Sequence, residues 1–174
     1  MSLLGAYFKQ PVEVEIYSIQ YNKDLSTTDE LQSAWQILSS SYATAWDQVS
    51  LTDVYTILLT DSERIIVTIS GVSFPVGASE GFRFYVSNKS QTFGITVGTF
   101  IVPARGAIAV VLKNGVWVVE ASIEGTLVNI LQDQRVRTRF LGGAAWEDYK
   151  VQVTVDTAEG RTLQDEFIVT IEEV

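Results

Sequence analysis

Acidic side chains are the residues best able to do chemistry in this chain, because the sequence contains neither histidine nor cysteine. Without these two residue types, thiol nucleophiles, Ser-His-Asp triads and the usual zinc sites are excluded. Carboxylate pairs remain, at Asp61/Glu63, Glu147/Asp148, Asp165/Glu166 and Glu172/Glu173. A glycosidase would need two carboxylates held roughly 5 to 9.5 Å apart across a sugar. Each pair falls in a turn or at a strand end, which favours solvated charges that keep sheet edges soluble. We therefore predict no enzyme, no catalytic residue, no metal ligand and no cofactor.

Positive charge is concentrated at Arg135, Arg137 and Arg139. Side chains alternate across a strand, so all three would share one face. Two interpretations stay open. The stripe is either a docking face for an acidic partner, a second copy of this chain included, or the solvent face of an outer strand.

Tryptophans are the second group of candidate interface residues. Trp46 and Trp146 fall in connections between predicted strands and are free to meet a partner or stack on a sugar, with ordinary packing as the alternative. Trp35 and Trp117 fall inside strand patterns, which predicts core positions for both.

Composition narrows the range of partners. The 174 residues are 47% hydrophobic and carry a net charge of −9, which is typical of a folded globular protein. The acidic balance disfavours nucleic acid and anionic lipid as partners. No apolar run approaches the roughly 20 residues of a membrane helix, and the first residues lack the features of a signal peptide.

The clearest structural signal is Asn114-Gly115 between two apolar runs, which predicts a hairpin of residues 107–112 and 116–121. Strict alternation of Val12, Val14 and Ile16 with acidic residues predicts a strand whose aliphatic face is buried and whose acidic face is wet. Residues 1–10 read as a loose arm.

Residues 26–39 are ambiguous, since an N-cap and a helical apolar stripe compete with strand alternation. We favour a strand, because short strands separated by Gly-rich turns dominate the rest of the chain. The pattern predicts an all-β sandwich or small barrel.

Both ends of the chain resemble a family of small immunoglobulin-like proteins of tailed bacteriophages, the fibre–tail adaptors. The similarity lies in a strand that ends in Gly142-Gly143, a Tyr149-led strand, a Thr157-x-x-Gly-Arg turn and a last strand at 167–171, with residues 7–25 similar to the family's N-terminus. The resemblance implies a non-catalytic structural protein located in the virion and assembled in the host cytoplasm.

The middle of the chain is similar to β-modules of phage fibres and head decorations, which often form trimers. Its features are the strand 82–87, the corner Val102-Pro103-Ala104-Arg105-Gly106 and the Asn-Gly hairpin. The two resemblances together imply an immunoglobulin-like β-sandwich formed by residues 10–45 plus 127–174, with a small β-sandwich or β-barrel module of residues 46–126 inserted in one loop.

Three functions follow from these resemblances and residues. The first is an adaptor that docks on the tail or neck, with other virion proteins as partners and a homo-oligomer, such as a trimer, as its expected state. A capsid decoration (cement) protein and a carbohydrate-binding module are the alternatives.

Overall fold

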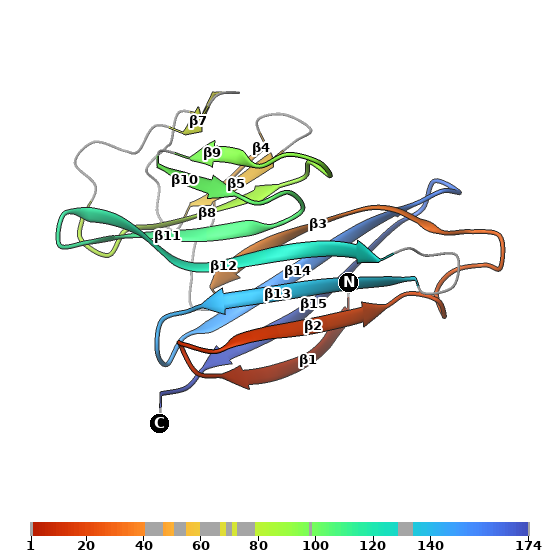
Figure 1. Ribbon diagram of the computed structural model, residues 1–174, viewed down its shortest axis with the longest axis horizontal. Coiled ribbons are helices and arrows are strands. Elements are labelled where there is room, and N and C mark those ends of the chain that lie inside the picture. Colours follow the sequence, from red (N-terminus) through yellow and green to blue (C-terminus); the bar gives the residue numbers. More distant parts are fainter. Residues whose placement is uncertain are drawn as a thin grey trace.

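The structure is a computed structural model that describes residues 2–40, 47–50, 55–59, 67–68, 71–72, 79–97, 99–128 and 134–173. Every regular element in these ranges is a β-strand (Figure 1). The predicted all-β class is therefore confirmed, and the arrangement of the sheets is consistent with a β-sandwich. In the described part of the chain there is no helix long and apolar enough to cross a membrane.

Two sheets form the sandwich. The smaller has four strands in the order β1 (Ser2–Lys9), β15 (Thr162–Ile171), β14 (Asp148–Thr157) and β3 (Leu31–Ser40). The larger has seven, in the order β2 (Val14–Gln20), β13 (Arg135–Gly142), β12 (Val116–Val128), β11 (Ala107–Lys113), β8 (Arg83–Asn88), β5 (Tyr55–Leu59) and β4 (Asp47–Ser50). All pairs are antiparallel except β1 with β15, which is parallel.

Two short hairpins complete the described strands. One pairs β9 (Ile95–Val97) with β10 (Phe100–Val102), and the other pairs β6 (Val67–Thr68) with β7 (Gly71–Val72).

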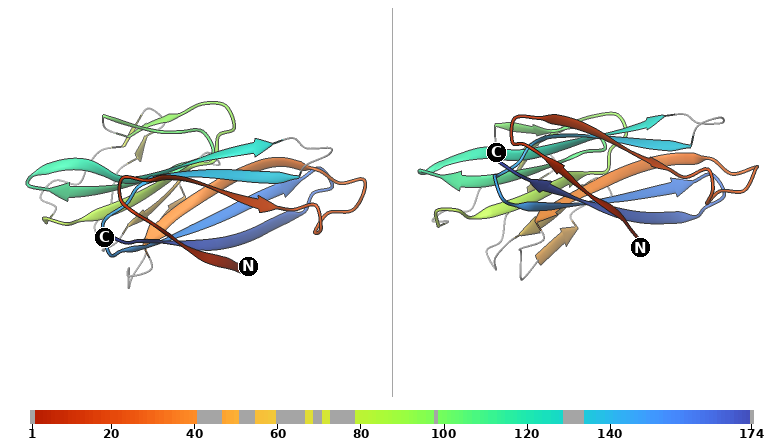
Figure 2. Two further views of the ribbon diagram at one scale, coloured as in Figure 1. Left: turned by 60° about the horizontal axis from the view of Figure 1, so that its bottom comes forward. Right: turned by 90° about the horizontal axis from the view of Figure 1, so that it is seen from below.

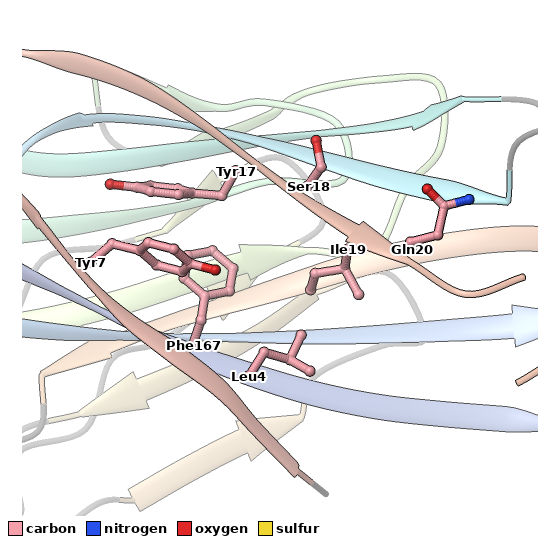
Figure 3. A pocket seen from close by; sticks show the side chains of 7 residues that line it. All are labelled: Leu4, Tyr7, Tyr17, Ser18, Ile19, Gln20 and Phe167. Atoms are coloured by element: carbon pink, nitrogen blue, oxygen red, sulfur yellow. The ribbon is translucent and has the colours of Figure 1, made fainter. Parts of the chain in front are cut away.

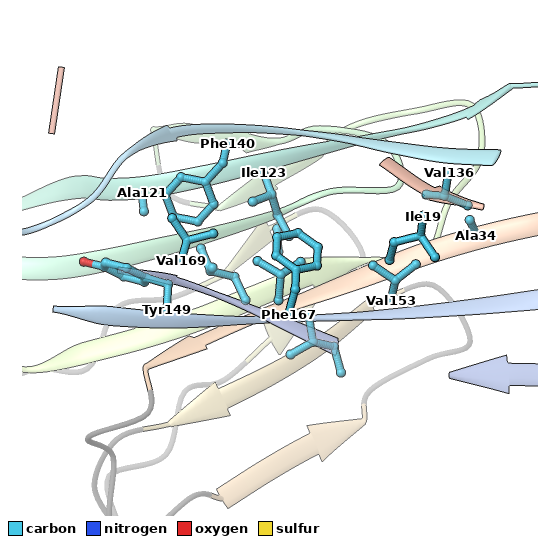
Figure 4. Close-up of a cluster of buried hydrophobic side chains, with 14 of the residues drawn as sticks. Ile19, Ala34, Ala121, Ile123, Val136, Phe140, Tyr149, Val153, Phe167 and Val169 are labelled. Carbon is cyan, nitrogen blue, oxygen red and sulfur yellow. The ribbon is translucent and has the colours of Figure 1, made fainter. Parts of the chain in front are cut away.

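The core lies between the four-stranded sheet and the β2–β13–β12–β11–β8 part of the larger sheet (Figure 4). Its largest fully buried side chains are aromatic, and they come from both layers: Tyr21, Tyr85, Phe140, Tyr149 and Phe167. Aliphatic residues at alternate positions of β14 and β15 fill the space between them, as expected of strands with one face on a core. Burial of this apolar surface is the main stabilising contribution to the sandwich.

The predicted hairpin is confirmed. β11 pairs antiparallel with β12, and Lys113 lies opposite Val116 across the turn. Asn114 and Gly115 have φ angles of 52° and 74°, the left-handed conformation that a type I′ turn requires at both central positions.

Most of the ambiguous segment is a strand: β3 begins at Leu31 and residues 26–30 form the turn before it, so the helical alternative for residues 26–39 is wrong. β3 pairs with β14 over nearly its whole length. On its inner face, the buried Gln36 accepts a hydrogen bond from Thr138 Oγ1 of β13 and donates to the Arg105 carbonyl. Contacts distant in sequence thus outweigh the local helical propensity of the segment.

Two expectations for the N-terminal region are wrong. Residues 2–9 form a strand, β1, whose register on β15 places Tyr7 beside Val169 and Lys9 beside Ile171. In β2 the predicted inside and outside are reversed: Val14 and Ile16 are 47% and 63% exposed, whereas Tyr17 packs on the core and Ile19 is buried. Figure 2 shows β1 and β2 diverging from the turn that joins them, each at the margin of its sheet.

The large sheet has no break at the predicted division of the chain into residues 10–45 plus 127–174 and residues 46–126. β12 runs from Val116 to Val128 and so belongs to both predicted parts. Strands from the two ends of the chain do pair, β2 with β13 and β3 with β14. The division stays a prediction.

Candidate docking surface

The three arginines lie on the outward face of β13, as their spacing predicts. Val136, Thr138 and Phe140 alternate with them and are buried, while Arg137 and Arg139 are exposed and Arg135 is half-buried. The strand therefore has a dry face on the core and a cationic face away from it.

The arginines differ in their partners. Arg135 Nε donates to Gln20 Oε1 at 3.1 Å, and Arg139 Nη1 lies 3.7 Å from Glu124 Oε2. Arg137 lies opposite Ser18 in the β2–β13 register and has no hydrogen bond or ion pair with any residue that the structure describes. Its charge is thus available to a partner.

Exposed aliphatic residues lie beside this charge on the neighbouring strand. Register places Ile16 opposite Arg139 and Val14 opposite Leu141, with both aliphatic side chains on the outward face. We call the surface formed by Val14, Ile16, Ser18, Arg137 and Arg139 the β2–β13 outer face. It combines apolar area with arginine, which are both features of protein interfaces.

Trp146 lies in the connection between β13 and β14 and is 67% exposed. Its φ of 66° is left-handed, which is a rare conformation for a bulky residue. Its backbone N–H donates to the Ile171 carbonyl at 2.7 Å, which holds the connection against the end of β15. Exposure and backbone strain together are typical of positions kept for binding. The other candidate tryptophan, Trp46, lies outside the described residues.

Structural contacts engage four carboxylates, those of Glu120, Glu147, Asp148 and Glu166. Arg83 bridges Glu120 and Glu147, with 2.7 Å between its Nη2 and Glu120 Oε1. Burial alone would lower the Arg83 pKa, but the two carboxylates raise it above its ordinary value. Asp148 accepts from Thr170 Oγ1 at 2.7 Å, and Glu166 lies 3.7 Å from Lys150.

Within the described ranges, no group of three or more acidic, histidine or cysteine side chains could hold a metal ion. The Asp61/Glu63 pair lies outside those ranges.

A cleft of about 190 Å³ opens between β1 and β2, and Figure 3 shows its lining. Tyr7, Tyr17 and Phe167 meet there, with ring centroids 4.8 Å apart for the two tyrosines and 5.2 Å apart for Tyr17 and Phe167. Burial, assisted by the charges of Glu15, Tyr7 and Glu13, raises the pKa of the Tyr17 hydroxyl to about 12.

Sequence reasoning missed the outward apolar face of β2 and the cleft beside it. A second set of residues competes with the alternation that begins at Val12. Tyr17, Ile19 and Tyr21 lie on the opposite face of the strand and offer a larger apolar surface. Continuing the pattern past Ile16 would have shown that either face of the strand could be the buried one.

Comparison with known families gives one match that bears on this surface. Residues 98–170 match the model of a family described as "Podophage GP4 fiber-tail adaptor protein gp77". The matched stretch runs through β10–β14 into β15 and includes Arg135, Arg137, Arg139 and Trp146, whereas β1 and β2 precede it. No curated protein matches the chain.

The match covers less than half of the chain. It crosses the predicted boundary between residues 126 and 127 and gives no support to an inserted module.

Proposed function

We propose that this protein is a non-catalytic structural component of a tailed-phage virion that docks on the tail or neck as an adaptor. The family match over residues 98–170 carries the proposal, because it includes the whole arginine-bearing strand β13 and the Trp146 connection. In this proposal the β2–β13 outer face and Trp146 bind another virion protein.

The chemistry of the surface supports docking. Stable interfaces have an apolar centre surrounded by polar groups, with tryptophan and arginine contributing most of the binding free energy. Ile16 and Val14 supply apolar area, and Arg137 supplies a charge that no described residue neutralises. Glu120, Glu147, Asp148 and Glu166, by contrast, are held in ion pairs and hydrogen bonds, which supports a role without catalysis.

Electron microscopy of virions that carry a label on this chain tests the proposal. We expect the label at the tail or neck. Label at three-fold or six-fold positions of the capsid would contradict the adaptor role and favour capsid decoration.

The expected oligomeric state is a homo-oligomer, with a trimer as one form. Size-exclusion chromatography with light scattering at micromolar concentration tests this expectation independently of the virion. A monomer at that concentration would contradict it.

A carbohydrate-binding module is the second candidate, because the exposed Trp146 ring could stack on a sugar. Glycan titration would support it if binding were saturable and were lost in Trp146→Ala. Absence of binding to any glycan tested would remove it.

A further inference from the structure

The cleft between β1 and β2 lies against the backbone of β2. Four consecutive β2 residues line it, Tyr17, Ser18, Ile19 and Gln20, together with Leu4, Tyr7 and Phe167. Successive side chains of a strand point to opposite faces, so neighbours can line one cleft only where the strand's edge borders it. Figure 3 shows Ser18 and Gln20 on one side of the β2 ribbon and Ile19 on the other.

Hydrogen-bond phasing identifies which backbone groups point toward this edge. Tyr21 N–H donates to the Gln134 carbonyl at 2.7 Å, one step beyond the Gln20–Arg135 pair of the register. In an antiparallel ladder, hydrogen-bonded pairs alternate with pairs that are not bonded to each other. Tyr17 and Ile19 therefore bond toward β13, and the N–H and C=O groups of Ile16 and Ser18 point away from it. β2 is an edge strand of the seven-stranded sheet, so these backbone groups point outward from that edge, which we call the margin of β2.

The two faces beside this margin differ in chemistry. On the inner side the cleft is lined by Leu4, Tyr7, Tyr17, Ile19 and Phe167, which are apolar or aromatic.

On the outer side Arg137 lies opposite Ser18, whose small side chain leaves the guanidinium room to extend across β2. An added strand would lie about 4.8 Å beyond β2, within reach of a long arginine side chain.

We propose that the margin of β2 binds an extended segment of a partner protein as an additional strand. The segment would alternate apolar side chains, which enter the cleft, with acidic side chains, which meet Arg137 on the outer face. Backbone hydrogen bonds to Ile16 and Ser18 would hold the segment, while the cleft and the arginine would select it. The aliphatic Ile16 side chain would be covered in the same step.

A second copy of this chain fits the margin less well. In a symmetric pairing of two β2 strands that keeps the faces aligned, the outward residues are Val14, Ile16, Ser18 and Gln20, none of which is acidic. Glu15 of the added strand would instead face the apolar cleft side. The like net charges of −9 also oppose such a pairing.

This inference rests on the geometry of β2 and not on the proposed function. Its test uses the full chain in solution and short synthetic peptides, so a failure here leaves the virion experiment untouched. Label found on the capsid would likewise leave the binding mode of β2 untouched.

Peptide titration followed by amide NMR is the experiment. The probes are a peptide that alternates valine with glutamate, its valine–lysine counterpart, and the valine–glutamate peptide N-methylated at alternate residues. We expect saturable binding of the glutamate peptide, slowed hydrogen exchange at the Ile16 and Ser18 amides, and about tenfold weaker binding of the lysine peptide. The peptide methylated on its β2-facing amides should not bind, because those amides no longer donate.

Variants of the chain sharpen the test. Ser18→Pro removes an N–H that points to the margin and leaves the β13 ladder intact, so it should abolish binding, whereas Ser18→Ala should retain it. Arg137→Glu should weaken binding of the glutamate peptide about tenfold, while the matched charge reversal Lys113→Glu on the distant hairpin should not. Thermal unfolding checks that each variant folds.

Three results would overturn the proposal. The first is the absence of saturable binding, and the second is equal binding of the lysine peptide. The third is a dimer of the chain that Ser18→Pro dissociates, which would assign the margin to a second copy.

Discussion

β2 and β13 are hydrogen-bonded neighbours in the same sheet, and both face the same core, yet β2 leaves two aliphatic residues, Val14 and Ile16, exposed on its outward face. β13 turns Val136 and Phe140 inward and its arginines outward. β2 turns Ile16 outward, where it is exposed beside Arg139. Val136 and Phe140 of β13 are fully buried within the chain, whereas Val14 and Ile16 of β2 stay exposed among the described residues.

The difference teaches that alternation alone does not say which face of a strand is buried. Tyr17, Ile19 and Tyr21 compete with Val14 and Ile16 for the core, and the aromatic face wins because Tyr7 and Phe167 offer it matching surfaces. A surface left apolar after such a competition is a candidate for binding. The predictions below test whether the two strands differ in this way.

The largest expected effect is at Phe140, on the inner face of β13. Its ring is fully buried and lies 5.6 Å from the Tyr149 ring. Phe140→Ala should lower the free energy of unfolding by about 3–5 kcal/mol, because it removes buried apolar area and leaves a cavity. Urea denaturation measures the change, with Phe140→Leu as a milder control. A loss below about 1 kcal/mol would mean that β13 is not the core strand described here.

A smaller effect of opposite sign is expected at Trp146, just beyond β13. Trp146→Asn should raise the free energy of unfolding by about 0.5–1 kcal/mol, because asparagine adopts the left-handed conformation at lower cost and little buried area is lost. Trp146→Val should lower it, since a β-branched residue is poorly suited to that φ. Thermal unfolding of the three proteins gives the order, and equal stabilities would argue against backbone strain at this position.

The stability of the protein at alkaline pH should depend on Tyr17 of β2. Burial raises its pKa from 10.0 to about 12, so the folded state favours the neutral hydroxyl more than the unfolded state does. The resulting stability is fully present below pH 10 and is lost as pH rises from 10 toward 12. Tyr17→Phe should remove part of this loss, and Tyr21 and Tyr149, whose pKa values burial also raises, should account for the rest.

Urea midpoints measured between pH 8 and pH 11 show the effect. Phe140→Leu on β13 serves as the control, because its destabilisation should be independent of pH. An unchanged alkaline slope in Tyr17→Phe would contradict the burial of this hydroxyl.

The smallest expected effect is at Ile16, on the outward face of β2. Ile16→Thr keeps a β-branched side chain and should change the free energy of unfolding by no more than about 0.5 kcal/mol, because the residue is largely exposed. A loss above about 1.5 kcal/mol would show that Ile16 is already covered within the chain, and the contrast with Phe140 would disappear.

Much of the fold was predictable from local sequence, and the failures have a common cause. The Asn114-Gly115 hairpin and the β13 alternation were correct because each is decided by residues close in sequence. β1 was missed because its partner is β15, at the other end of the chain. The faces of β2 were reversed because Phe167 and Tyr7, which decide them, are distant or follow no alternating pattern.

The candidate surface was predictable only in part. The arginine stripe followed from spacing, but its position beside Ile16 and Ser18 follows from the β2–β13 register, which the sequence does not state. The exposure of Trp146 was expected from its place in a connection, whereas its left-handed backbone was not.

Thiol labelling of Ile16→Cys, in the free chain and in assembled virions, tests most directly whether the outward face of β2 is covered by a partner. The chain has no cysteine of its own, so the introduced thiol reports one position. Ala158→Cys, in the exposed turn between β14 and β15, is the control. We predict that both thiols react with maleimide in the free chain and that only the Ile16→Cys thiol is protected after assembly. An Ile16→Cys thiol that reacts equally fast in both states would contradict the account.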